Sequence, residues 1–320
     1  MNTKNLKRIL VTRKLPIITQ QKLEKLNVEL TQWQSHEQAI PRHILMDWIK
    51  EKDGVLLMLT DKVDTELLSS GSKLQCLSTM SVGCDHIDLE ACKNRKVEVY
   101  NTPGVLTDAT AELAIGLLLS TLRKIPQAIN AVKDGKWGPW NPVWMCGTQL
   151  TGKTVGIVGL GSIGMAIAER LIPFKIKSLL YTGRTKKETI FPSMFCSLDD
   201  LVAQSDIVII ACDLNAQTKG MFDKSVFEKM KSNSVLINIA RGLIVNQSDL
   251  VDALDNHQIE AVGLDTTDPE PLDTNHPLLT RLQDRCVILP HIGSATFETR
   301  EAMADLALSQ LIHHLDVKSS

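Results

Sequence analysis

Apolar and polar positions alternate with two different periods along most of the chain. Short apolar runs rich in β-branched residues predict strands over 8–12, 54–59, 74–80 and 97–100, and amphipathic segments such as 86–93 predict helices between them. Strands that alternate with helices at this spacing are typical of βαβ units. The first hundred residues are therefore expected to form an α/β domain with a parallel sheet.

The same alternation restarts after residue 153 and continues almost to the end of the chain. The expected strands are 154–158, 177–181, 206–211, 234–239, 260–264 and 286–290, and the expected helices are 162–172, 198–204, 223–230 and 247–255. A final amphipathic helix is expected over 296–314. This pattern predicts a second α/β domain, built on a doubly wound parallel sheet.

Two segments between these regions follow neither strand nor regular amphipathic spacing. The segment 107–123 is apolar on nearly every helical face, which predicts a buried helix that connects the two domains. The stretch 134–147 is rich in Gly, Pro and Trp and is expected to be a loop or a projecting arm. It contains Trp137, Trp140 and Trp144, three of the five Trp of the chain.

Composition narrows the class of protein. The 320 residues include 35 Lys+Arg and 37 Asp+Glu, so no strong field favours nucleic acid or a membrane surface. Basic residues predominate from Lys4 to Lys14, which allows a transit peptide, although a first strand with basic flanks is favoured. The seven Cys form no C-x-x-C pair, which favours reduced thiols in a cytoplasmic protein without a metal site.

A glycine-rich turn joins the strand expected at 154–158 to the helix that follows. In Gly159-Leu160-Gly161-Ser162-Ile163-Gly164, the first glycine allows a tight turn and the second lets a pyrophosphate approach the backbone. The third glycine lets the helix pack closely on the strand, and the helix N-terminus offers free N–H groups to the anion. In this strand–turn–helix context the motif predicts a dinucleotide site.

The end of the next strand favours NADPH over NADH. An NAD site usually places an Asp or Glu there, but the segment from Leu180 to Lys187 contains no acid. Arg184 could bind a 2′-phosphate through its guanidinium, and Lys186 or Lys187 could add positive charge. A solvated basic turn is the alternative interpretation, and use of NADH remains possible.

Three polar residues follow three expected strands, and parallel sheets bind ligands at that edge. Arg241 follows the strand at 234–239, Glu270 follows the strand at 260–264, and His291 follows the strand at 286–290. Beside a nicotinamide, His291 could protonate a developing oxyanion while Glu270 holds its ring and favours its charged form. Arg241 could bind a substrate carboxylate and polarise the carbonyl. Each residue alone could instead have a structural role.

With these residues in place, the chain resembles the D-2-hydroxyacid dehydrogenases, most closely the glyoxylate/hydroxypyruvate reductases. The matching stretches are 78–83, 106–108, 110–114, 158–164, 239–242, 263–265, 268–272, 274–279 and 288–296. The resemblance implies a flavodoxin-like substrate domain, 1–104 plus 294–320, that closes by a hinge on a Rossmann-type cofactor domain, 105–293. It also implies that Arg241, Glu270 and His291 are catalytic.

The resemblance assigns further contacts. The substrate would meet the backbone at Val82 and Gly83, together with Arg241, His291 and Ser294. The expected cofactor contacts are Gly159, Gly161, Ser162, Ile163, Gly164, Gly183, Arg184, Thr185, Lys186, Asp213, Ile239 and Asp265. Ser162 stands where many members carry Arg, so one charge contact to the pyrophosphate is missing.

The leading hypothesis is a cytoplasmic NADPH-dependent reductase of small 2-oxo acids, which converts glyoxylate to glycolate and hydroxypyruvate to D-glycerate. In this family the arm, here 134–147, reaches a partner subunit, so a homodimer is expected, with Trp140 bounding the substrate pocket. Two alternatives stay open, a dinucleotide-sensing corepressor of the same fold and a 3-phosphoglycerate dehydrogenase. Both usually carry extra segments that 320 residues do not accommodate.

Overall fold

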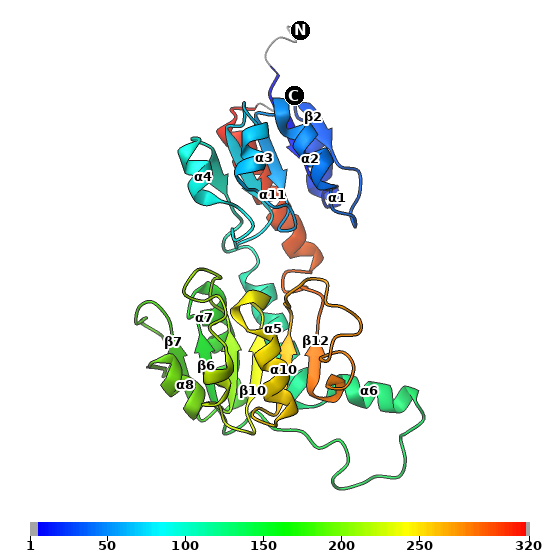
Figure 1. Cartoon of the computed structure of the whole chain (residues 1–320), viewed down its shortest axis with the longest axis vertical. Coiled ribbons are helices and arrows are strands. Elements are labelled where there is room, and N and C mark those ends of the chain that lie inside the picture. Colours follow the sequence, from blue (N-terminus) through cyan, green and yellow to red (C-terminus); the bar gives the residue numbers. More distant parts are fainter. Residues whose placement is uncertain (1–5, 318–320) are drawn as a thin grey trace. The chain divides into compact units, whose positions relative to one another are not determined.

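The computed structural model describes residues 6–317. The outermost parts of the predicted substrate domain, 1–5 and 318–320, lie outside the described residues, and so does Lys4 of the basic start. Contacts divide the chain into two compact units, Met1–Leu106 with Ser294–Ser320, and Thr107–Gly293. Each unit is built around its own parallel sheet (Figure 1).

The first unit has five parallel strands in the order β2-β1-β3-β4-β5. The strands are β1 (Arg8–Val11), β2 (Glu29–Gln32), β3 (Gly54–Leu57), β4 (Cys76–Thr79) and β5 (Glu98–Tyr100). Its helices are α1 (Ile17–Glu24), α2 (Arg42–Trp48), α3 (Thr65–Ser70), α4 (Leu89–Asn94) and α11 (Phe297–His314), with a 3₁₀ turn at η2 (Ile49–Glu51). The sequence did not predict β2, because an edge strand with polar residues lacks the apolar signal of a central one.

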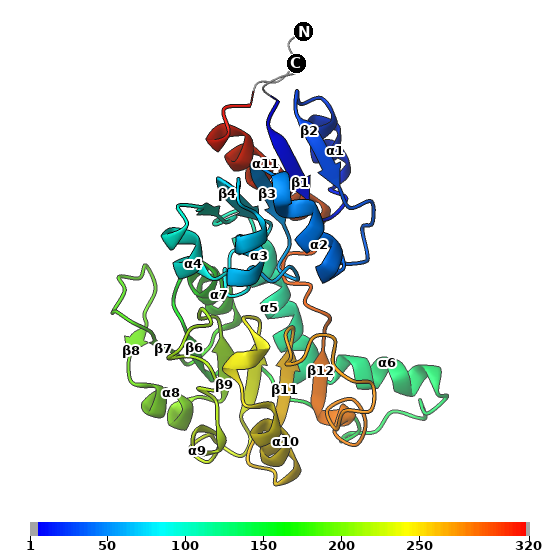
Figure 2. The same ribbon diagram turned by 45° about the horizontal axis from the view of Figure 1, so that its top comes forward.

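Helices cover both faces of this sheet. Strand residues such as Leu10 and Leu77 pack with α2 and α3 in one buried cluster. The long helix α11 lies on the opposite face, along β3 and β4 (Figure 2). A Cβ added at Gly54 would approach Leu311 Cδ1 to 2.9 Å, so α11 is seated directly on β3.

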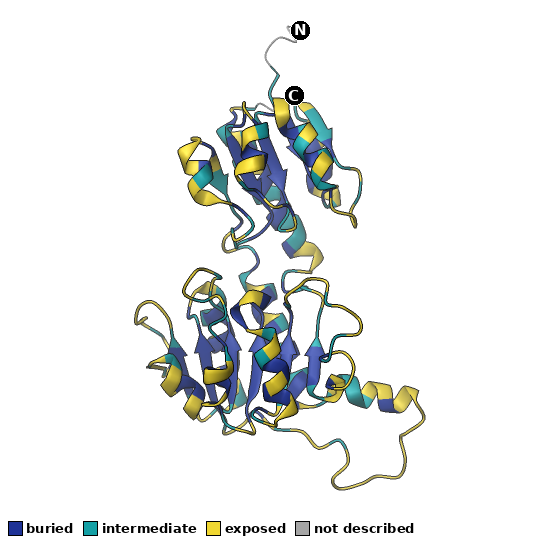
Figure 3. Ribbon diagram, in the orientation of Figure 1, coloured by how far each residue is buried: buried dark blue, intermediate teal, exposed yellow. Residues whose placement is uncertain are grey.

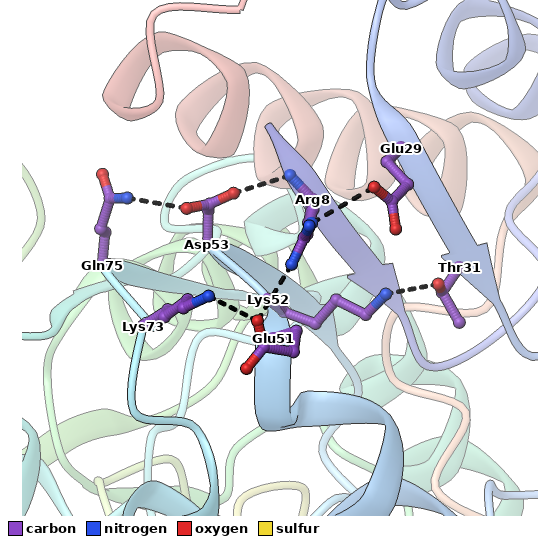
Figure 4. Close-up of polar contacts among 8 residues, drawn as sticks. All are labelled: Arg8, Glu29, Thr31, Glu51, Lys52, Asp53, Lys73 and Gln75. Carbon is purple, nitrogen blue, oxygen red and sulfur yellow. Dashed lines mark hydrogen bonds and ion pairs between the residues drawn. The ribbon is translucent and has the colours of Figure 1, made fainter. Parts of the chain in front are cut away.

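Charged side chains at the amino edge of the first sheet satisfy one another (Figure 4). Arg8 bonds Glu29 at 3.2 Å and Glu51 at 3.0 Å, and its backbone N–H donates to Asp53 at 2.7 Å. Lys73 also reaches Glu51. These groups hold strand ends together, so the opposite, carboxyl edge is the place to look for chemistry.

The second unit has seven parallel strands in the order β12-β11-β10-β9-β6-β7-β8. The strands are β6 (Thr154–Val158), β7 (Ser178–Thr182), β8 (Met194–Phe195), β9 (Ile207–Ile210), β10 (Val235–Asn238), β11 (Ala261–Leu264) and β12 (Cys286–Ile288). The α-helices are α5 (Thr107–Leu122), α6 (Ile125–Lys133), α7 (Ser162–Leu171), α8 (Leu198–Gln204), α9 (Lys224–Phe227) and α10 (Gln247–Asp255). Three 3₁₀ turns are η3 (Ile172–Phe174), η4 (Gly242–Ile244) and η5 (Gln283–Arg285).

The second sheet is buried on both faces, as a doubly wound fold requires (Figure 3). One core cluster joins it to α8, α9 and α10, and the other joins it to α5 and α7. The expectation that α5 would be buried all round was wrong. Asp108, Glu112 and Gly116 form an exposed stripe, because α5 packs on the sheet with one face only.

The helix α6 and the segment 134–147 project from the second unit (Figure 1). The sequence did not predict α6, which begins after Lys124 in a left-handed conformation, φ 52°. No helix or strand occurs within 134–147, as expected. Its Cys146 is exposed, which corrects the expectation of buried thiols at that position. Across residues 6–317, no helix has both the length and the apolar character needed to cross a membrane.

Candidate active site

The glycine turn after β6 has the geometry of a pyrophosphate cradle. Gly159 has φ +97°, and a Cβ there would lie 2.6 Å from the Cys212 backbone. A Cβ at Gly164 would lie 2.1 Å from the Gly159 carbonyl oxygen, so α7 touches the turn itself. A Cβ at Gly161, the N-cap of α7, would meet nothing within 4 Å. The turn therefore leaves its outer side open to a ligand at Gly161, and these residues fit a dinucleotide.

This turn lies at the switch point of the sheet. The strands β7 and β8 extend from β6 on one side, and β9 to β12 extend from it on the other. Ligands bind at such points in doubly wound sheets. The Gly159 N–H donates to the Thr182 carbonyl at 2.9 Å, which ties the turn to the end of β7.

The segment after β7 is exposed, with Gly183, Thr185 and Lys186 at the surface. The guanidinium of Arg184 and the carboxylate of Asp213, from the neighbouring β9 exit, lie 4.0 Å apart, and both side chains are largely exposed. Two of the predicted cofactor residues are thus brought together beside the glycine turn. Solvent screens an ion pair of this kind, so Arg184 stays available to an anion.

Arg241, Glu270 and His291 follow β10, β11 and β12, which are neighbours in the sheet. The Nδ1 atom of His291 lies 2.9 Å from Oε2 of Glu270, and both side chains are partly buried. The other carboxylate oxygen of Glu270 accepts the Thr267 N–H at 3.2 Å. The imidazole is therefore oriented by a carboxylate that is itself held by the backbone.

Two residues that sequence reasoning did not select shape the loop of Arg241. The side chain of Asn238 is fully buried, accepts the Ala240 N–H at 3.0 Å and donates to the Arg241 carbonyl at 2.9 Å. A Cβ at Gly242 would lie 2.0 Å from the Thr267 carbonyl oxygen, so the exits of β10 and β11 are in backbone contact. The position of Asn238, a polar residue that ends an apolar strand, was the available signal.

Asp265 is 1% exposed, and its carboxylate accepts two backbone N–H groups, from Ile292 and Gly293, each at 2.8 Å. Burial raises the pKa of Asp265, while the two amides and the nearby His291 oppose that rise. Burial also raises the pKa of Cys212, beside the glycine turn, to about 11, so this thiol stays protonated at neutral pH.

In the first unit, the loop after β4 is held by side chains on several elements. The Ser81 hydroxyl donates to the Gly83 carbonyl at 2.7 Å, and Asn101 donates to the Val82 carbonyl at 2.8 Å. Because these bonds engage the carbonyl oxygens, the loop is pinned on its acceptor side. This bracing fits a loop that offers its N–H groups to an anion.

The remaining predicted residues differ in exposure. Ile239 is buried in the core, whereas Ile163 and Ser294 are half-buried. Ser162 is exposed at the first turn of α7. Trp140 is 87% exposed on the projecting segment.

Comparison with known proteins agrees with this geometry. Residues 115–293 match the model of the D-isomer specific 2-hydroxyacid dehydrogenase family, NAD binding domain. The human protein named glyoxylate reductase/hydroxypyruvate reductase is 48% identical over 317 residues, which cover 98% of this chain and 96% of that protein. A glyoxylate reductase of Thermofilum pendens is 45% identical over 85% of this chain and 80% of its own length.

A solved structure carries ligands. An NADPH-dependent glyoxylate/hydroxypyruvate reductase from Sinorhizobium meliloti, in complex with NADP and malonate, is 31% identical with a TM-score of 0.81, over 95% of this chain and 92% of that one. The predicted fold class is confirmed, since both units are parallel-sheet α/β domains and the second has the glycine turn of a Rossmann-type domain. The chain belongs to the D-isomer specific 2-hydroxyacid dehydrogenase family and is an NAD(P)-dependent enzyme of that family.

Proposed function

We propose that the protein reduces small 2-oxo acids with NADPH, converting glyoxylate to glycolate and hydroxypyruvate to D-glycerate. The observation that carries this proposal is the 2.9 Å bond between His291 and Glu270, at strand ends adjacent to that of Arg241, in a unit with a dinucleotide-type glycine turn. The names of the similar proteins support the choice of substrates. Cofactor binding is assigned to residues 105–293, and the substrate domain to 1–104 with 294–320.

Each residue of the trio has a separate task in the proposed reaction. Bound NADPH supplies a hydride to the 2-oxo carbon. His291, held through Nδ1 by Glu270, donates the Nε2 proton to the oxygen as the carbonyl becomes an alkoxide. Arg241 binds the substrate carboxylate and polarises the carbonyl, and Arg241→Lys weakens 2-oxo acid binding because a lysine cannot form the paired contact.

Further substrate contacts are proposed at four positions. The backbone N–H groups at Val82 and Gly83 would bind the substrate carboxylate, since their loop is braced through its carbonyls. Ser294 and Trp140 complete the proposed set. Trp140→Ala is expected to change the preference among 2-oxo acids.

The assay is NADPH oxidation by the purified protein with glyoxylate and with hydroxypyruvate. His291→Ala, prepared in parallel, controls for contaminating reductases. Turnover by the wild type, lost in the variant, supports the proposal. Measurable NADPH affinity without turnover of either acid overturns it and favours a cofactor-sensing protein of the same fold.

The proposed preference for NADPH rests on the exposed basic segment after β7. Arg184 binds the 2′-phosphate and Lys186 adds charge, while Asp213 lies close enough to reduce the preference. A higher kcat/KM for NADPH than for NADH is expected, and Arg184→Ala lowers the NADPH value more than the NADH value. Lys229→Ala, at an exposed ion pair elsewhere on the same unit, is the matched control. Equal losses with both cofactors in Arg184→Ala would contradict the assignment.

We also propose a homodimer formed through residues 134–147. Trp137, Trp140 and Val143 are 72%, 87% and 76% exposed, and apolar side chains of this size are favoured in interfaces over free surfaces. Sedimentation of Trp137→Ala is expected to show weaker association than the wild type. Phe297→Ala, which removes a ring that is 96% exposed on α11, is the control. A monomeric wild-type protein would refute the proposal.

The cytoplasm is the proposed compartment, since all seven Cys are free thiols. Fractionation of cells that express the chain tests this, and recovery in an organelle would contradict it.

A further inference from the structure

His291 has a backbone conformation that is unusual for a residue with a side chain. Its φ is 54°, in the left-handed region, where non-glycine residues are uncommon. Such a conformation persists only where the surrounding contacts impose it. The position of the imidazole therefore depends on whatever holds this backbone.

One residue receives all three consecutive backbone N–H groups of the loop. The His291 N–H donates to the Asp265 carbonyl at 2.9 Å. The Ile292 N–H donates to Oδ1 of Asp265 and the Gly293 N–H donates to Oδ2, each at 2.8 Å. Because Asp265 is 1% exposed, water does not compete for these bonds.

The loop is seated tightly as well as hydrogen-bonded. A Cβ at Gly293 would lie 3.2 Å from Oδ2 of Asp265 and 3.3 Å from Cγ2 of Thr110 on α5. The Asp265 N–H itself donates to the Asn238 carbonyl at 2.8 Å, so the anchor belongs to the sheet rather than to a free loop. A shift of the Asp265 carboxylate would therefore move the backbone that carries His291.

We propose that Asp265 is a positioning residue for His291, an inference that rests on the proposed role of His291 as proton donor. Its carboxylate fixes the main chain at 291–293, while Glu270 fixes the ring through Nδ1. Both carboxylates come from the same exit of β11, five residues apart. One segment thus sets both the place and the orientation of the imidazole, and the buried carboxylate acts through the loop.

The test is a double-variant cycle with Asp265→Asn and His291→Ala. An asparagine has the same shape but only one acceptor oxygen, and its NH₂ group faces one of the two backbone N–H groups. We expect Asp265→Asn to lower kcat by about 10- to 100-fold, because a displacement of about 1 Å can have an effect of that size. The dissociation constant for NADPH, measured by fluorescence titration, is expected to change less than about threefold.

The double variant shows whether Asp265 acts through His291. If it does, His291→Ala with Asp265→Asn is no slower than His291→Ala alone, since effects of residues that act as a unit do not add. Multiplied losses overturn the proposal. A weaker NADPH affinity with unchanged kcat also overturns it, and it makes Asp265 a cofactor contact.

Two controls separate other causes. Asp206→Asn removes a carboxylate that accepts the Thr154 N–H at 2.9 Å at the amino edge of the same sheet, and it should lower stability without lowering kcat. If Asp265→Asn does not fold, Asp265→Ser removes the carboxylate without placing an NH₂ group against the loop. If His291→Ala stays fully active, the proposed function fails; if only Asp265→Asn and Asp265→Ser keep wild-type kcat, the positioning proposal alone fails.

Discussion

Gly161→Ala and Gly164→Ala are expected to fail in different ways, although both residues lie in one turn. A Cβ at Gly164 would lie 2.1 Å from the Gly159 carbonyl oxygen, which is backbone and cannot rotate away. A Cβ at Gly161 meets nothing within 4 Å, and the φ of −79° there is ordinary for alanine. The fold therefore requires glycine at 164, whereas only a bound ligand requires it at 161.

The geometry sets the size of each effect. Overpacking of a tight contact costs about 1–3 kcal/mol, and the helix propensity of Ala returns up to about 1 kcal/mol at Gly164. The net loss of about 1–2 kcal/mol corresponds to a fall in Tm of about 2–8 °C for a domain of this size. At Gly161, the poorer N-cap and the lower entropy of the unfolded chain nearly cancel, each being about 1 kcal/mol or less.

Thermal unfolding without cofactor, together with the KM for NADPH, separates the two variants. Gly161→Ala should keep its Tm within about 2 °C of the wild type and raise the KM for NADPH at least about tenfold, since a methyl group blocks the approach of the pyrophosphate. Gly164→Ala should lose Tm. A wild-type KM in Gly161→Ala, or an unchanged Tm in Gly164→Ala, would refute the reasoning.

Three further outcomes are expected. His291→Ala lowers kcat by about 10²- to 10⁴-fold if it is the general acid, and a loss below about tenfold in steady-state assays would point to another donor. Burial alone would raise the pKa of Asp206, but the Lys231 ammonium and a backbone amide outweigh it and lower that pKa. The carboxylate therefore stabilises the fold above about pH 4 and loses this effect as the pH falls further, so urea unfolding of Asp206→Asn should show a smaller loss of stability between pH 7 and pH 3 than the wild type; equal losses would contradict this. Burial raises the pKa of Cys76 and Cys286 to about 12, so both should resist a thiol reagent at pH 8 until the protein unfolds, and labelling of either in the native protein would count against it.

Periodicity predicted the central elements because buried strands and amphipathic helices carry strong apolar signals. The strand 154–158 and the helices 198–204 and 247–255 have the predicted bounds in the structure. The elements that were missed lie at the margins, namely the edge strands β2 and β8 and the helix α6. Edge strands bury only part of their surface, and α6 presents Ile129 and Val132 to the outside, so their patterns do not follow burial in a single chain.

The candidate trio was predictable because a parallel sheet brings successive strand exits to one edge. The prediction needed only the order of elements, and β10, β11 and β12 are neighbours. What the sequence could not predict was how these exits hold one another. The buried amide of Asn238 and the backbone contact of Gly242 with Thr267 depend on atoms that are distant in sequence.

The positive φ of His291 shows why site residues and site geometry differ in how well they can be predicted. A histidine after an apolar strand is visible in the sequence, but a left-handed backbone at a residue with a side chain runs against local preference. It requires a compensating contact from elsewhere, and the buried carboxylate of Asp265 provides two hydrogen bonds to the amides that follow. Local preference and global structure conflict at the residue proposed to donate the proton, which is where functional demands are expected to override local rules.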